Sequence, residues 1–221
     1  MNNKFLKHFL VIGSGTFISM VIGFLTTPII TRIVSPTEYG QFSIFTMYSN
    51  MALMVLDLGL DQALVRFFYQ KETDQYRREL LCKGLKNPVI GTAVSGIVVL
   101  ILSAIGLIQF ELGKVALSLV CFYTFIQIIY RFSLLLVRLQ YKSKLYSILG
   151  IVQKTVYVVL TILFVKLNFF SDTMSLAVAT VLAALTCMII SIVAERRLWN
   201  PGLLGKNECT ITQGELIGYA Y

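Results

Sequence analysis

The chain has 221 residues, of which 57% are hydrophobic and only 14% are charged, and its mean hydropathy is +0.78. The core of a water-soluble domain of this length cannot hold so much apolar surface, so the composition excludes an ordinary soluble enzyme or binding domain. The net charge of +8 does not indicate nucleic-acid binding, because the basic residues lie between apolar blocks and no aromatic–basic recognition module accompanies them.

Long apolar blocks follow one another along the chain. Each holds roughly 20 residues with few charges, the length at which an α-helix crosses about 30 Å of hydrocarbon. The sequence therefore predicts an all-α polytopic membrane protein in which residues 1–213 form one six-helix lobe. The expected spans are 9–30, 39–60, 88–110, 115–137, 145–165 and 173–194, and residues 214–221 resemble the truncated start of a seventh helix.

Small residues recur every four positions in the first span. Gly15, Ser19 and Gly23 give a strip along which another helix can approach closely. Pro28 removes a backbone donor and is expected to bend the outer part of the helix. Short external turns are expected near Ser35–Pro36, Glu111–Gly113 and Asn168–Asp172.

The segment 71–87 is charged and carries Tyr76, Leu80 and Leu81 at roughly helical spacing. It is either an amphipathic helix on the inner membrane surface or a solvated linker helix. Basic residues are concentrated in alternate connecting segments, at 4–7, 66–86, 138–144 and 196–206. Because short basic loops stay in the cytoplasm, both chain ends are predicted to be cytoplasmic.

The sequence offers little for metal or nucleotide chemistry. The only histidine is His8, and the cysteines show no CxxC pair, so Cys82, Cys121, Cys187 and Cys209 are interpreted as free thiols. The chain has no GxxxxGK[ST] phosphate loop. We therefore expect no metal, no cofactor and no enzyme activity, and any work must draw on a gradient or a partner.

Polar side chains share one face in three of the predicted spans. Lipid offers such groups no partner, so we expect these faces to look toward protein or water. Their members are Ser43, Thr46, Asn50, Asp57 and Asp61 in the second span, Thr124, Gln127 and Arg131 in the fourth, and Ser147, Lys154, Tyr157 and Thr161 in the fifth.

Ionised groups inside the spans cost at least roughly 2.5–3.5 kcal/mol each on insertion scales. Lys154 lies deep in its helix and is expected to face a water-filled cavity. Asp57 and Arg131 are expected to face a cavity, to form a buried ion pair with each other, or to snorkel to the cytoplasmic interface. Asp61 and Arg66 lie nearer that interface and are expected to snorkel.

Two stretches that flank the second span carry a more specific pattern. The first, 32–40, reads RIVSPTEYG, and the second, 57–66, reads DLGLDQALVR. Together they resemble the N-terminal signature of the polysaccharide-export flippases, the translocases of O-antigen and other lipid-linked oligosaccharides in the multidrug/oligosaccharidyl-lipid/polysaccharide exporter superfamily. The residues that carry the resemblance are Arg32, Pro36, Glu38, Tyr39, Gly40, Gly59 and Arg66.

The resemblance implies a transporter of about twelve to fourteen helices, built as two lobes around a cavity that opens alternately to either side. This chain corresponds to the N-terminal lobe and is expected to be inactive alone. The implied substrate is an undecaprenyl-pyrophosphate-linked oligosaccharide in the bacterial inner membrane. The implied partners are membrane lipids, a second lobe and polysaccharide-assembly proteins, with no role for nucleic acid.

Candidate roles can be assigned to individual residues. Pro36 and Gly40 are expected to shape the external turn, Glu38 to cap a helix or pair with Arg32, and Gly59 to permit close packing. Asp57 is the candidate for coupling to a proton or sodium gradient. The candidate cavity residues are Arg131 and Lys154, which would attract the pyrophosphate, together with Gln127, Asn50 and Tyr157.

Three other functions are compatible with the sequence. The first is a small-molecule or drug antiporter of the same superfamily, against which the two signature stretches argue. The second is a non-transporting scaffold subunit. The third is a membrane-embedded glycosyl or acyl transferase, for which the acidic pair Asp57 and Asp61 is thin support.

Overall fold

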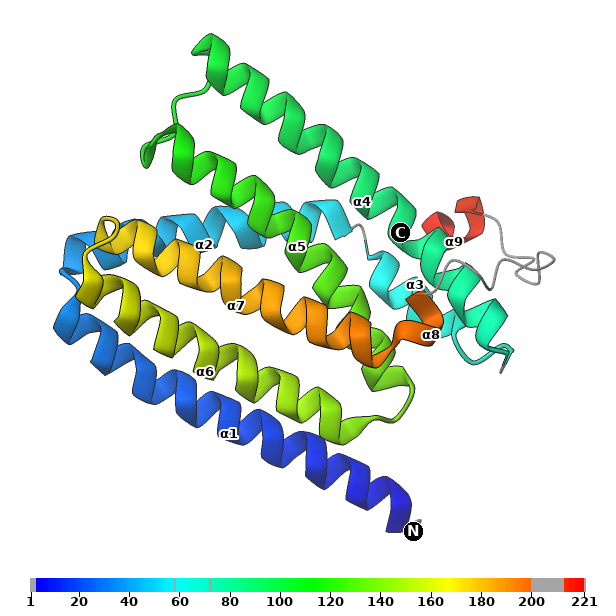
Figure 1. Cartoon of the computed structure of the whole chain (residues 1–221). Coiled ribbons are helices and arrows are strands. Elements are labelled where there is room, and N and C mark those ends of the chain that lie inside the picture. Colours follow the sequence, from blue (N-terminus) through cyan, green and yellow to red (C-terminus); the bar gives the residue numbers. More distant parts are fainter. Residues whose placement is uncertain (1–2, 58, 72, 200–212, 221) are drawn as a thin grey trace.

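The computed structural model describes residues 3–57, 59–71, 73–199 and 213–220, and all the regular structure in these ranges is helical (Figure 1). The helices are α1 (Asn3–Ile33), α2 (Pro36–Asp57), α3 (Leu60–Phe67), α4 (Asp74–Ile105), α5 (Gly113–Leu139), α6 (Ser143–Leu167), α7 (Asp172–Ala194), α8 (Arg196–Trp199) and α9 (Gln213–Ala220).

Within the described residues, α1, α4, α5, α6 and α7 are each long and apolar enough to cross a membrane. α2 and α3 meet the same criterion only as a pair, and their axes differ by 50°. The bend includes Gly59, whose φ of 69° lies in the left-handed region that glycine adopts without strain. Among the described residues five spans are therefore continuous, and the sixth predicted crossing requires α2 and α3 to act together as one bent span; the second helix ends at Asp57 rather than at residue 60.

The three predicted turns are confirmed. α1 continues through Pro28 to Ile33, and α2 begins at Pro36, where a residue without an amide hydrogen suits the first helical position. α6 ends before Asn168, which has a φ of 50°, and the Ser171 side chain accepts a hydrogen bond from the Met174 amide to cap α7.

Residues 74–87 do not form a separate surface or linker helix, which corrects both expectations for this segment. They are the first turns of α4, which runs without a break into the third span. Tyr76, Leu80 and Leu81 are fully buried and pack against α3, the end of α5, α8 and α9. Burial of this apolar face explains why a strongly charged segment stays helical. α9, at the predicted start of a seventh helix, joins the same core through Leu216.

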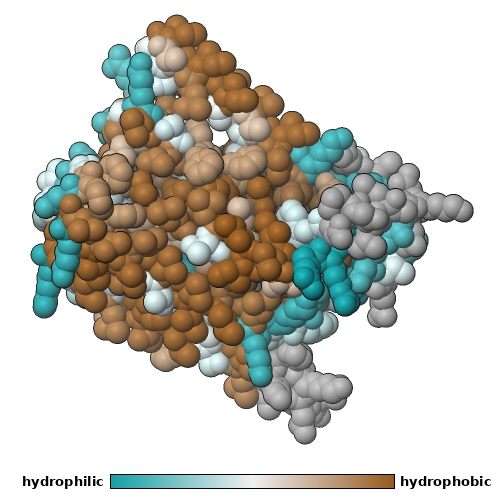
Figure 2. All heavy atoms as spheres, viewed as in Figure 1, coloured by the Kyte–Doolittle hydropathy of each residue, from teal (hydrophilic) through white to brown (hydrophobic). Residues whose placement is uncertain are grey.

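The long helices form an elongated bundle in which α1 packs on α6, α6 on α7, and α7 on α5 (Figure 1). Figure 2 shows hydrophobic residues covering most of the visible face and hydrophilic residues gathered at its two ends. We call the end with the turns at 34–35, 106–112 and 168–171 the outer end, and the end with α3 and α8 the inner end, following the predicted orientation.

The predicted strip of small residues is where α1 meets α6. Ser19 Oγ donates to the Gly150 carbonyl at 3.1 Å, and Ser147 Oγ donates to the Val11 carbonyl at 2.8 Å. At Gly15 the backbones are so close that a Cβ would lie 2.9 Å from Ser147 Cα. The expectation of close packing is thus confirmed at Gly15 and Ser19.

We expect Gly15→Ala to lower the free energy of unfolding by about 1–3 kcal/mol, because the added methyl group must push α1 away from α6. The measurement is the apparent unfolding temperature of the purified chain in mild detergent. Gly13→Ala is the matched control, since a Cβ at Gly13 meets nothing within 4 Å. Equal unfolding temperatures for the two variants would contradict close packing of α1 on α6 at Gly15.

Candidate functional site

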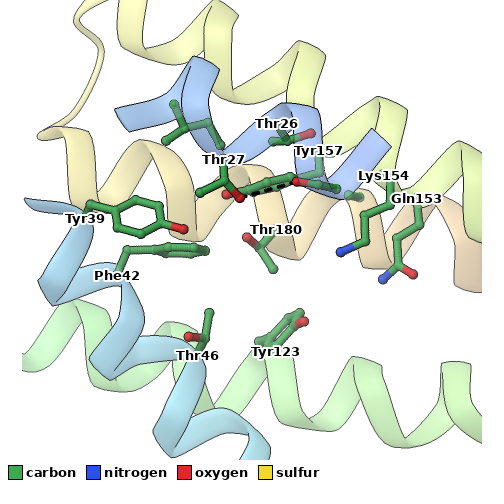
Figure 3. A pocket seen from close by; sticks show the side chains of 13 residues that line it. Thr26, Thr27, Tyr39, Phe42, Thr46, Tyr123, Gln153, Lys154, Tyr157 and Thr180 are labelled. Atoms are coloured by element: carbon green, nitrogen blue, oxygen red, sulfur yellow. Dashed lines mark hydrogen bonds between the residues drawn. The ribbon is translucent and has the colours of Figure 1, made fainter. Parts of the chain in front are cut away.

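A polar cavity of about 310 Å³ opens between α1, α2, α5, α6 and α7 toward the outer end of the bundle. In Figure 3, Lys154 and Gln153 extend from α6, and Tyr39 and Phe42 of α2 lie on the opposite side of this outer cavity. Its remaining polar lining is supplied by Thr26 and Thr27 of α1, Thr46 of α2, Tyr123 of α5, Tyr157 of α6 and Thr180 of α7.

Aromatic rings form one wall of the outer cavity. The ring centroid of Phe42 lies 6.3 Å from that of Tyr39 and 6.3 Å from that of Tyr157. Behind them, the buried Phe45 packs on Tyr123 with the centroids 5.8 Å apart. Such contacts hold large side chains in fixed positions, so the outer cavity has a rigid, partly apolar wall with phenol groups at its surface.

Two further cavities continue from the outer cavity toward the inner end. The middle cavity, about 330 Å³, lies between α1, α5 and α6 and shares Gln153 and Lys154 with the outer one. The inner cavity, about 470 Å³, shares Leu134 and Tyr146 with the middle one. Because neighbouring cavities share lining residues, we treat the three together and call them the polar track, which follows the faces of α5 and α6.

Lys154 occupies the point where the outer and middle cavities meet. Its side chain is exposed, and no ion pair joins it to another residue in the described part of the chain. The sequence predicts a water-filled cavity around Lys154, and the structure places this residue in the lining of two cavities. Tyr157, one helical turn further along α6, lines the outer cavity.

Arg131 lies beside the inner cavity and binds two carboxylates. Its Nη2 is 2.8 Å from Asp61 Oδ2 and 3.3 Å from Asp57 Oδ2. Asp57 is 4% exposed and Asp61 is 8% exposed. Of the alternatives for Asp57 and Arg131, the structure shows the ion pair. The expectation that Asp61 snorkels is wrong, because the bend after α2 turns Asp61 back toward α5.

This charge cluster, Asp57, Asp61 and Arg131, holds two carboxylates for one guanidinium. Gln62 N donates to Asp61 Oδ1 at 2.8 Å, while the buried Asp57 Oδ1 has no hydrogen-bond partner. The cationic charge of Arg131 is therefore more than balanced by its neighbours. Arg138, which also lines the inner cavity, is exposed and forms no ion pair with another described residue.

The other predicted cavity residues do not join the polar track. Gln127 donates to the Tyr123 hydroxyl at 2.5 Å and so supports one wall of the outer cavity without lining it. Asn50 is exposed on α2 and lines none of the three cavities. Thr124, from the same predicted stripe as Gln127, lines a different, apolar groove.

Glu38 ties the start of α2 to the start of α7. Its own amide donates to Ser35 Oγ at 3.3 Å, and its Oε2 accepts a hydrogen bond from the Thr173 amide at 2.8 Å and another from the Thr173 hydroxyl. The carboxylate thus lies at the positive end of the α7 dipole. Of the two roles predicted for Glu38, the structure shows helix capping. The helix that Glu38 caps is α7, not α2, to which Glu38 itself belongs.

We expect Glu38→Ala to lower the free energy of unfolding by about 1–2 kcal/mol, because the first turn of α7 loses its capping acceptor and a favourable charge. Unfolding temperature in detergent is the measurement. Glu38→Gln, which keeps an acceptor, should lose less. Glu111→Ala removes an exposed carboxylate in a neighbouring turn and serves as the control. If Glu111→Ala destabilises the chain as much as Glu38→Ala does, the capping role of Glu38 is contradicted.

The remaining signature residues have different environments. Tyr39 lines the outer cavity. Pro36 starts α2, while a Cβ at Gly40 would meet nothing within 4 Å, so no close approach requires that glycine. Gly59 has a left-handed backbone, which glycine adopts without strain. Arg32 and Arg66 are exposed.

Several residues of the polar track were not singled out from the sequence: Thr26, Thr27, Tyr123, Gln153, Thr180 and Arg138. The threonines gave no distinctive signal, since their hydroxyls also bond carbonyls of their own helices, as Thr26 does with Ile22 at 2.6 Å. Tyr123 and Gln127 lie four residues apart on α5, a spacing that could have linked them.

The described residues contain no group of three or more His, Cys, Asp or Glu side chains placed to hold a metal ion. Cys82, Cys121 and Cys187 are free thiols, as interpreted from the sequence, and Cys209 lies outside the described residues. The site is a series of adjacent cavities between candidate membrane-spanning helices, lined by hydroxyl, phenol and amide groups, with Lys154 where the outer and middle cavities meet.

Known proteins share both sequence and fold with this chain. Residues 5–214 match a protein family described as polysaccharide biosynthesis protein. The chain is also similar to a solved structure described as the outward-facing conformation of a multidrug resistance transporter of the MATE family, in the MOP superfamily, with a TM-score of 0.65 and 15% identity. The alignment covers 96% of this chain and 50% of the transporter, so the fold is that of one half of such a protein. A search of curated proteins finds no significant match.

Proposed function

The chain belongs to the polysaccharide biosynthesis protein family, and we propose that it takes part in moving a lipid-linked oligosaccharide across the bacterial inner membrane. The polar track would carry the hydrophilic head of this amphiphile, undecaprenyl pyrophosphate joined to sugars, while the polyprenyl chain stays in lipid. The observation that carries the proposal is Lys154, a cation in the middle of a membrane-embedded polar path.

The charge of the outer and middle cavities suits an anionic head. Among the described residues, the lining of the outer and middle cavities includes one cation, Lys154, and no carboxylate. A phosphate oxygen bound there would gain a charge-assisted hydrogen bond in a setting of low dielectric constant. The same lining disfavours a cationic drug.

The outer cavity also suits sugar. Sugar hydroxyls both donate and accept hydrogen bonds, and so do the hydroxyls of Thr27, Tyr39 and Tyr157. The rigid aromatic wall offers apolar surface for the ring carbons. Cavities of this kind combine apolar walls with a few polar groups that orient the ligand.

A second lobe would complete the path. The polar groups of the track require protein or water opposite them, since lipid cannot satisfy them. The chain spans half the length of the solved transporter that it matches. We propose that a second six-helix lobe faces the track and that alternating access arises between the two, with polysaccharide-assembly proteins supplying and consuming the substrate.

Deletion of the gene in its own host tests the proposed function. We expect lipid-linked oligosaccharide to accumulate on the cytoplasmic face and surface polysaccharide to decrease, with no change in drug susceptibility. Increased susceptibility with unchanged polysaccharide would favour a drug antiporter. Polysaccharide loss without an accumulated, untranslocated intermediate would point to a scaffold subunit instead.

Asp57 is the proposed coupling residue. The charge cluster has one carboxylate more than it has cations, and Asp57 Oδ1 lacks a partner, so a proton could bind there without breaking the contact with Arg131. We expect Asp57→Asn to remove the dependence of oligosaccharide translocation on the proton or sodium gradient. Full gradient-dependent translocation by the variant would defeat the assignment; Asn50→Ala, an exposed change on the same helix, is the control.

A further inference from the structure

A separate cavity lies on the opposite side of α2 from the outer cavity. This apolar groove, about 500 Å³, is lined by α2, α4, α5 and the turn at 108–110. Its α2 side includes Tyr48, Met51 and Val55, all three exposed, so the groove opens sideways between α2 and α4. α4 lies at the edge of the bundle, next to α5 (Figure 1).

The aliphatic hydroxyl groups of the apolar groove already donate to their own helices, and its one phenol belongs to Tyr48, an exposed residue. Thr92 Oγ1 bonds the Pro88 carbonyl at 2.6 Å, Ser95 Oγ bonds the Thr92 carbonyl at 3.2 Å, and Thr124 Oγ1 bonds the Val120 carbonyl at 2.8 Å. An occupant therefore needs no hydrogen-bonding group. It gains only by apolar contact, in proportion to the surface it buries.

A solid layer of side chains separates the apolar groove from the polar track. Phe42, Phe45 and Val120 are buried in one core cluster, with Tyr123 packed against them. Phe42 and Tyr123 face the outer cavity on one side of this layer, and Val120 faces the groove on the other. A substrate whose head lies in the track cannot place its chain in the groove through this wall, so the occupant is a different molecule.

We propose that the apolar groove binds one acyl chain of a bilayer phospholipid, held as a resident lipid between α2 and α4. The groove runs between spanning helices to the outer turn, where Gln109 lines its mouth and Glu111 and Lys114 are exposed nearby. The charges of Glu111 and Lys114 balance, so the chain rather than the headgroup determines binding. The lipid would fill the space that separates α4 from α2 and fix the position of α4.

Photolabelling of the purified full chain tests the proposal. A phospholipid with a diazirine in its acyl chain should label peptides that contain residues 48–56, 92–99 and 117–124. Ala52→Phe places a bulky side chain inside the groove and should reduce this labelling several-fold. Ala93→Phe makes the same change at an exposed position of α4 that does not line the groove, and should leave labelling unchanged.

Competition identifies the occupant. Unlabelled phospholipid should displace the probe, while undecaprenyl phosphate should not. Displacement by undecaprenyl phosphate alone would assign the groove to the substrate chain, and labelling that falls as protein concentration rises would assign it to a second copy of the chain; either result overturns the proposal. Equal labelling of wild type and Ala52→Phe would overturn it as well, without bearing on oligosaccharide translocation.

Discussion

Replacement of Lys154 by methionine is expected to weaken binding of the lipid-linked oligosaccharide while leaving the fold intact. Truncating one partner of a desolvated charge pair costs about 2–5 kcal/mol, which at about 1.4 kcal/mol per tenfold is a loss of roughly 30-fold or more in affinity. Methionine keeps the length and apolar stem of lysine, so the cavity shape is preserved. The measurement is the dissociation constant for undecaprenyl-pyrophosphate-linked oligosaccharide.

Two variants make this prediction specific. Lys154→Arg keeps the positive charge and should retain most of the binding. Lys166→Met removes an exposed lysine from the last turn of the same helix, outside the cavities, and should have little effect. If Lys154→Met and Lys166→Met bind equally well, the cation in the middle of the polar track has no role in recognition.

Arg131→Ala is expected to lower the free energy of unfolding by about 3–5 kcal/mol, more than either Gly15→Ala or Glu38→Ala. It leaves the buried carboxylates of Asp57 and Asp61 next to each other without a counter-charge. Arg138→Ala, two turns further along α5 at an exposed position, is the control and should change stability little. Unfolding temperature in mild detergent, compared for Arg131→Ala and Arg138→Ala, is the measurement.

A rescue experiment tests the physical reason for this loss. In the Arg131→Ala background, Asp57→Asn removes one of the two unbalanced charges and should recover part of the lost stability. The same substitution in the wild type should not stabilise the chain. Failure of the rescue would mean that Arg131 stabilises the chain by packing of its stem rather than by balancing the carboxylates.

The fold was largely predictable because hydrophobic length is a strong signal. Blocks of roughly 20 apolar residues marked the spans, and Pro36 and Asn168 marked turns that the structure confirms. The bend at Gly59 was not predicted, because one glycine near the end of an apolar run looks the same whether it packs closely or turns the chain. The sequence did not predict that α4 extends back to Asp74. Its charged first half is stabilised by packing against α3, α8 and α9, which are short helices or lie far along the chain, so the sequence gives no local signal of this packing.

The site was predictable only in part, for a related reason. Periodicity correctly placed polar residues on shared faces, but it could not say which neighbour each face meets. Lys154 and Tyr157 meet the outer cavity, whereas Thr124, in an equally regular stripe, meets the apolar groove. Asp61 could be assigned to the charge cluster only once the direction of α3 was known, since a straight second span would have carried it toward the cytoplasmic interface.

Binding of undecaprenyl-pyrophosphate-linked oligosaccharide to the purified chain tests the central claim most directly. The polar track predicts saturable binding by the wild type, strongly reduced binding by Lys154→Met, and no competition from a hydrophobic cationic drug. Saturable binding of the cationic drug, with no measurable binding of the oligosaccharide lipid, would contradict the assignment of the track to an anionic, sugar-bearing head.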